Sequence, residues 1–118
     1  MILVDTSVWV DHLRSRNPAL VSLLEGDQVL THPFVIGELA CGRIRNRAEI
    51  LRLLTTLPAA TIARHDDVMA FVDGHRLSGR GIGWIDAHLL ASALLSHAGL
   101  LTLDQRLARV ARAVGVAT

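Results

Sequence analysis

The sequence predicts an α/β fold in which helices cover both faces of a central parallel sheet of four to five strands. Short apolar runs, such as ILV at 2–4 and LLTL at 100–103, are typical of buried parallel strands. Between these runs, apolar residues recur at three- and four-residue spacing, which predicts helices. Because strands that alternate with helices form parallel sheets, we expect three α/β/α layers.

The first half of the chain is expected to contain two strands and four helices. Thr6 or Ser7 can cap the first helix, and Asn17 can cap the second. Pro18 and Pro33 suit the first turns of helices. The expected elements are a strand at 2–5, a helix over 6–14, a helix over 17–24, a strand at 28–31, a helix over 33–42 and a helix over 45–56.

The second half repeats this alternation. His65, Asp66 and Asp67 are expected to cap a helix, and the alternating glycines of GRGIG predict a loop. The expected elements are a strand at 60–63, a helix from 65 to 77, a loop over 79–83, a helix over 84–97, a strand at 100–103, a helix over 104–113 and an edge strand at 114–117.

Length and composition predict one domain over residues 1–118. Hydrophobic residues make up 51% and charged residues 19%, which excludes a disordered chain. No apolar window approaches the roughly 20 residues of a membrane span, so we expect a soluble protein with no membrane partner. The N-terminus lacks a basic leader and Cys41 is the only cysteine, which together favour a cytoplasmic location.

Two aspartates follow apolar runs, Asp5 after ILV and Asp104 after LLTL. The carboxyl ends of strands form the ligand-binding edge of an open α/β sheet, so both carboxylates are expected in one crevice. The alternative is that each residue only caps the following helix.

Two further acids lie within apolar helical segments. Glu38 shares a helix face with Val35 and Cys41 in FVIGELACG, where burial of an isolated carboxylate would be costly. Asp86 shares a face with Leu89 in WIDAHLLASALL. The open alternatives are a partly exposed helix edge for Glu38 and a helix N-terminus for Asp86.

Converging carboxylates repel one another unless a cation neutralises them. A set of oxygen ligands without cysteine or clustered histidine suits Mg²⁺, with Mn²⁺ as a substitute. Such a site can activate water and hold a phosphodiester oxygen, so the predicted reaction is metal-assisted phosphodiester hydrolysis.

Four segments together resemble the PIN-domain family, in particular the VapC toxins: DTSVW, ELACG, GRGIGWID and TLDQRL. The resemblance covers nearly the whole chain. It implies an endoribonuclease in which Asp5, Glu38, Asp86 and Asp104 form the catalytic centre. Of these, Asp5, Asp86 and Asp104 are expected to bind the metal. The resemblance also implies support from the hydroxyl of Thr6 or Ser7, a homodimer, an RNA substrate and a VapB-type antitoxin.

RNA contacts are expected from arginines, since all 12 basic residues are Arg and Arg suits phosphate. The candidates are Arg14, Arg43, Arg45, Arg47, Arg80 and Arg106, with Trp9 or Trp84 as stacking surfaces. The histidines are dispersed and have no zinc-helix spacing.

Other phosphate-handling classes fit less well. Receiver domains and P-loop proteins require a lysine that this chain lacks, and GRGIG follows a helix instead of a strand, unlike a dinucleotide fingerprint. The alternative that remains is a PIN-like module that binds RNA or protein without catalysis. Four carboxylates that repel phosphate argue against it.

Overall fold

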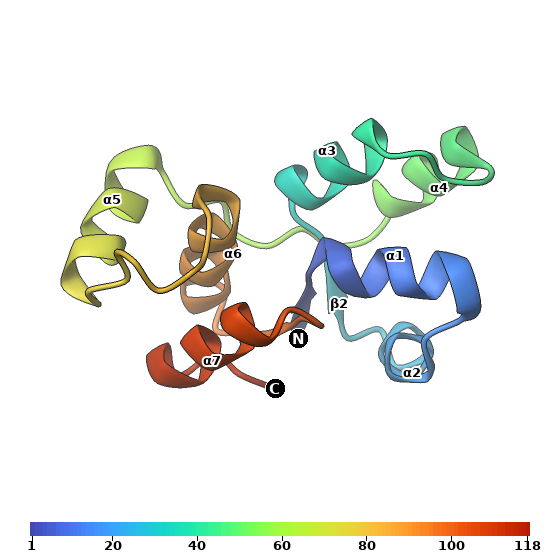
Figure 1. The fold of residues 1–118 in the computed structure, drawn as a ribbon. Coiled ribbons are helices and arrows are strands. Elements are labelled where there is room, and N and C mark those ends of the chain that lie inside the picture. The colour runs from blue at the N-terminus through green and yellow to red at the C-terminus, as the bar shows by residue number, and fades with distance from the viewer.

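The computed structural model describes all residues from Met1 to Thr118. Three short strands and seven helices alternate along the chain (Figure 1). The strands are β1 (Ile2–Val4), β2 (Val29–Leu30) and β3 (Gly99–Leu101). The helices are α1 (Thr6–Ser15), α2 (Pro18–Glu25), α3 (Pro33–Cys41), α4 (Arg47–Leu54), α5 (His65–Gly74), α6 (Trp84–Leu95) and α7 (Gln105–Val114).

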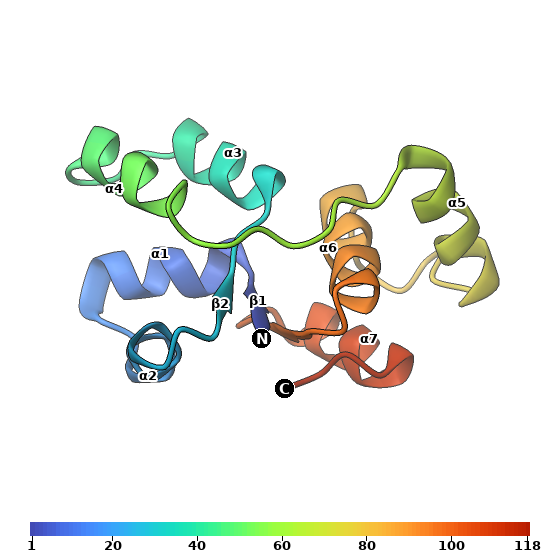
Figure 2. The same ribbon diagram turned by 180° about the vertical axis from the view of Figure 1, so that it is seen from behind.

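The strands form one parallel sheet in the order β2-β1-β3, which confirms the predicted α/β class. Helices α1 to α4 gather on one side of the sheet and α5 to α7 on the other, as both views show (Figures 1 and 2). This arrangement makes the molecule longer in one direction, with extents of 40 × 25 × 23 Å.

The sheet has three strands, so the prediction of four to five strands was wrong. The expected strand at 60–63 does not form, and a single parallel bridge joins Thr31 to Ala59, just before this segment. Beyond it, the backbone N–H groups of Thr61 and Ala63 donate to the hydroxyls of Ser96 and Ser92. Because helix α6 supplies these acceptors, the segment packs against that helix and does not continue the ladder.

The expected edge strand at 114–117 is also a single bridge, between Leu100 and Ala117. Helix α7 continues to Val114, and Gly115 ends it in the left-handed conformation with φ 85°. The hydrophobic pattern did not distinguish a last helical turn from a short apolar strand.

Most helix starts agree with the sequence. Asn17 caps α2 by accepting from the backbone N–H of Leu20, and Pro18 and Pro33 lie in first turns. The exceptions are α1, whose N-cap is Asp5, α5, whose N-cap is Arg64, and α4, which begins at Arg47 and not at residue 45. None of the seven helices has the length and apolar character of a membrane span.

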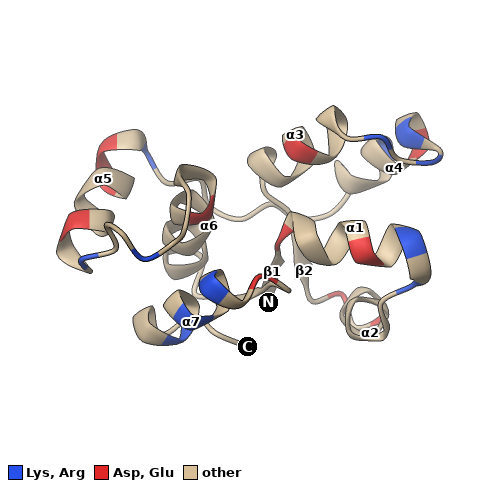
Figure 3. Ribbon diagram, in the orientation of Figure 1, with Lys and Arg blue, Asp and Glu red and all other residues tan.

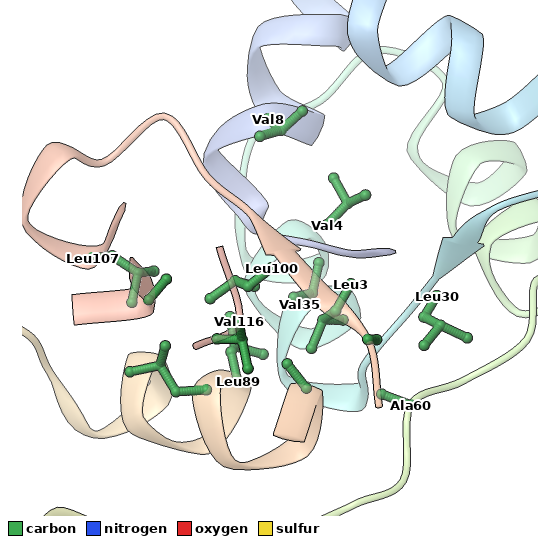
Figure 4. Packing of buried hydrophobic residues seen from close by; sticks show 14 of the residues in the cluster. Leu3, Val4, Val8, Leu30, Val35, Ala60, Leu89, Leu100, Leu107 and Val116 are labelled. Carbon is green, nitrogen blue, oxygen red and sulfur yellow. The ribbon is translucent and has the colours of Figure 1, made fainter. Parts of the chain in front are cut away.

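The hydrophobic core surrounds the sheet (Figure 4). Leu3 of β1 lies in register with Leu30 of β2 and Leu100 of β3, and all three side chains are buried. Helix α6 packs against β1 and β3 and contributes the fully buried Leu89. The core therefore fixes the carboxyl ends of β1 and β3 relative to α6.

Candidate active site

Asp5 and Asp104 lie at the same edge of the sheet, as the strand-end pattern predicted. Asp5 directly follows β1, and its backbone N–H donates to the carbonyl of Leu101 at the end of β3, at 2.9 Å. Asp104 begins the helix that follows β3. In Figure 3, acidic positions on α3, on α6 and at the end of β1 surround the middle of the molecule.

The Asp5 carboxylate is held by two hydroxyl groups. Its side chain is 7% exposed. Oδ2 accepts hydrogen bonds from Ser7 Oγ at 2.7 Å and from Thr102 Oγ1 at 2.8 Å. Both bonds use Oδ2, so Oδ1 is left for another ligand.

The same hydroxyls fasten the turn between β3 and α7. The backbone N–H of Leu103 donates to Ser7 Oγ, and that of Asp104 donates to Thr102 Oγ1, each at 3.0 Å. The hydroxyl of Thr6 or Ser7 was expected to support the acids, and Ser7 is the one that contacts Asp5, whereas Thr102 was not expected. A hydroxyl at the strand end, two residues before a candidate acid, is the signal that could have identified it.

Asp104 and Asp86 act as helix caps, as the open alternatives proposed. Asp104 Oδ1 accepts from the backbone N–H groups of Arg106 at 2.9 Å and Leu107 at 3.2 Å. Asp86, in the first turn of α6, accepts from the N–H of Gly83 through Oδ2 at 3.0 Å. In both residues one oxygen caps a helix and the other is free, so capping does not prevent metal binding.

Glu38 differs from its expected environment. It is exposed on α3, so the argument that its carboxylate is buried was wrong, and the helix-edge alternative describes it correctly. Thr6 at the start of α1 donates from Oγ1 to Glu38 Oε1 at 2.7 Å. This bond ties Glu38 to the residue next to Asp5.

The four acids share one electrostatic environment. Burial raises the pKa of Asp86, and the negative charges of Asp5, Asp104 and Glu38 raise this pKa further. The hydrogen bond from Gly83 acts in the opposite direction on the pKa. Since Asp86 senses all three other acids, the structure brings the four predicted residues into one neighbourhood.

No three acidic or histidine side chains surround a single point closely enough to chelate an ion as they stand. Carboxylates that come closer together repel one another unless a cation lies between them. The donor set nevertheless fits a hard cation, since each acid retains an oxygen without a protein partner. Mg²⁺ usually keeps several waters and needs only one or two direct carboxylates.

The raised pKa of Asp86 predicts that Asp86→Asn stabilises the metal-free protein near neutral pH. The folded state binds the Asp86 proton more tightly than the unfolded chain does. Its stabilising contribution is therefore present below the ordinary Asp pKa and is lost as pH rises through the raised value. Thermal melts in EDTA should show a higher Tm for the variant near neutral pH and no gain in acid. A gain that is equal at every pH would contradict this origin.

Buried histidines lie outside the acid group. Burial, with a smaller effect of His88, lowers the pKa of His32 to about 4. His32 Nδ1 accepts from the N–H of Phe34, and Nε2 lies 3.1 Å from Ser92 Oγ. These contacts hold the start of α3 against α6.

The GRGIG loop packs closely on α7. A Cβ at Gly81, where φ is 81°, would lie 2.7 Å from Cδ of Arg106. The loop that precedes Asp86 is thus fitted to the side chain of Arg106, two residues after Asp104, and this packing needs glycine.

This fold and this edge define a class: small α/β proteins with a parallel sheet and an acidic centre suited to a divalent cation. The PIN domain family profile matches residues 2–113. Ribonuclease VapC32 of Mycobacterium tuberculosis is 48% identical over 118 residues, covering 99% of this chain and 95% of that protein. Ribonuclease VapC19 of the same organism is 31% identical over 115 residues, with 90% of each chain covered. The chain belongs to the PIN-domain family, in its VapC-type branch.

Proposed function

We propose that this protein is a Mg²⁺-dependent endoribonuclease, the toxin of a type II toxin–antitoxin pair. The observation that carries the proposal is the group of four carboxylates at the sheet edge, each with one oxygen bound to the protein and one free. The similarity to two proteins named ribonucleases supports it. PIN-domain ribonucleases generally depend on a divalent metal, and Mn²⁺ is the expected substitute for Mg²⁺.

In this proposal Asp5, Asp86 and Asp104 hold the metal, and Glu38 completes the ligand shell directly or through water. The ion supplies neutralisation of the phosphodiester charge and activation of water. Ser7 and Thr102 orient the Asp5 carboxylate through their bonds to Oδ2. The Gly83 and Arg106 backbone N–H groups similarly orient Asp86 and Asp104.

The partners are proposals of the same kind. We expect a VapB-type antitoxin that covers the acidic edge, a homodimer, and action on cytoplasmic RNA such as tRNA or rRNA. A neighbouring reading frame that encodes a small DNA-binding protein is expected for a toxin. Its absence would favour a solitary processing nuclease.

The test is cleavage of total cellular RNA by the purified protein in Mg²⁺, in Mn²⁺ and in EDTA. Cleavage should require the metal, because the four carboxylates alone repel phosphate. Product ends should carry a 5′-phosphate and a 3′-hydroxyl, whereas 2′,3′-cyclic phosphates would indicate a metal-independent reaction. A folded protein, free of antitoxin, that cuts nothing in any metal would favour the alternative of a non-catalytic binding module.

A further inference from the structure

A cavity that is not lined by Asp5, Asp86 or Asp104 lies beside the acid group. Its volume is about 520 Å³, and it lies between α1, the end of α3 and the segment that joins α3 to α4. Glu38 forms part of its wall. Because Glu38 is bound to Thr6, next to Asp5, this one carboxylate belongs both to the acid group and to the cavity wall.

The cavity combines cationic walls with an apolar lining. Arg14 enters it from α1, and Arg43 and Arg45 enter it from the joining segment. The apolar part of the lining is Val10, Leu13, Leu39 and Ile44. In Figure 3 basic positions gather at the end of α1 and around the start of α4, on the side of the molecule away from α5 to α7.

The three guanidinium groups are available to a ligand. All three side chains are exposed, and none of the hydrogen bonds of the structure uses their guanidinium nitrogens. Arg47 behaves differently, because its Nε donates to the carbonyl of Ala40 at 2.9 Å. This bond fastens the start of α4 to α3, so Arg47 supports the shape of the joining segment.

We propose that this cavity is a phosphate-binding subsite for RNA nucleotides adjacent to the cleaved bond. The proposal rests on the nuclease function and extends it. An RNA strand carries phosphates at regular intervals, so one can lie at the metal centre while the next meets the arginines. Guanidinium groups bind phosphate oxygens in pairs, and the apolar lining accommodates a ribose. The Glu38 carboxylate separates the two positions, which disfavours an anion that reaches the centre without a metal.

The experiment measures binding and does not depend on catalysis. A short fluorescein-labelled oligoribonucleotide of mixed sequence is titrated with the protein in EDTA, and fluorescence anisotropy gives Kd over a range of salt concentrations. The test variant combines Arg14→Gln, Arg43→Gln and Arg45→Gln. The matched control combines Arg64→Gln, Arg109→Gln and Arg112→Gln, which removes the same charge from exposed positions away from the cavity.

The cavity variant is expected to bind at least about tenfold more weakly, with a salt slope smaller by about 2, since each single-strand phosphate contact contributes roughly 0.7. The control should stay near the wild type. With cleavable RNA, KM should rise in the cavity variant while kcat changes little. Melting curves of both variants establish that they are folded.

Three results would overturn the subsite. The first is unchanged RNA binding in the cavity variant, and the second is an equal loss of RNA affinity in the cavity variant and the control. The third comes from a parallel titration with a short polyglutamate peptide. If the cavity variant loses affinity only for this peptide and not for RNA, the cavity binds an acidic protein segment instead. The nuclease proposal fails separately. If the protein cuts no RNA but needs these arginines to bind it, the nuclease proposal fails and the RNA-binding cavity stands. If the cavity variant cuts RNA as well as the wild type does, only the subsite proposal fails.

Discussion

Replacing Asp5 with Asn is expected to reduce metal-dependent RNA hydrolysis by more than about 100-fold while the protein stays folded. Loss of residues that only orient a metal ligand typically costs 10- to 100-fold, so loss of a ligand charge should cost more. Asn is nearly isosteric and can still accept from Ser7 and Thr102 through its carbonyl oxygen. The change therefore removes charge from the centre and preserves its hydrogen bonds.

Two comparisons make this measurement specific. Thr102→Val removes one of the two hydrogen bonds to Oδ2 and the acceptor of the Asp104 N–H, but it keeps the Asp5 charge, so its loss should be smaller, about 10- to 100-fold. Asp66→Asn, at an exposed position of α5, should retain wild-type cleavage. Rates are compared on one RNA at saturating Mg²⁺. Unchanged hydrolysis by Asp5→Asn would remove Asp5 from the centre.

The positions of the acids could be predicted because they follow from the geometry of parallel sheets. Two apolar runs that end in Asp5 and Asp104 must meet at one edge once both strands are parallel and adjacent. Asp86 was suggested by its apolar neighbours, and its half-buried environment agrees with that reasoning. Their roles as metal ligands stay predictions.

The environment of Glu38 could not be predicted from its own helix. Apolar neighbours at helical spacing indicated burial, but Phe34 and Cys41 are themselves exposed on the same side. What places Glu38 is the hydrogen bond from Thr6, a residue on a different helix. Periodicity describes one helix at a time and contains no information about such contacts.

The expected strand at 60–63 failed for a similar reason. Apolar residues at 60–63 fitted a strand, and Ala60 and Ala63 are indeed buried. Whether this segment pairs with a strand depends on which hydrogen-bond acceptors lie near its backbone. Here the N–H groups of Thr61 and Ala63 donate to the hydroxyls of Ser96 and Ser92 on α6. A local pattern predicts burial more reliably than it predicts the hydrogen-bond partner.

Leu3→Ala is expected to destabilise the protein by about 2–5 kcal/mol, the range for removing a fully buried leucine side chain. Leu3 is 0% exposed and lies between Leu30 and Leu100 in the middle of the row of leucines across the sheet (Figure 4). Neighbours on both strands, together with α6 on β1, limit how far the structure can close around the cavity. The cost should therefore lie in the upper part of this range.

The effect is large relative to a total stability of roughly 5–15 kcal/mol for a domain of this size, and it corresponds to a fall in Tm of roughly 8–20 °C.

Leu53→Ala is the matched control, since the same atoms are removed from a side chain that is 53% exposed. Its cost should stay under about 1 kcal/mol. Chemical denaturation of the three proteins in EDTA measures both values without a contribution from metal binding. Equal costs for the two variants would mean that the leucine row does not hold the sheet, and that the edge carrying Asp5 and Asp104 is fixed by the helices and by the bonds of Ser7 and Thr102 instead.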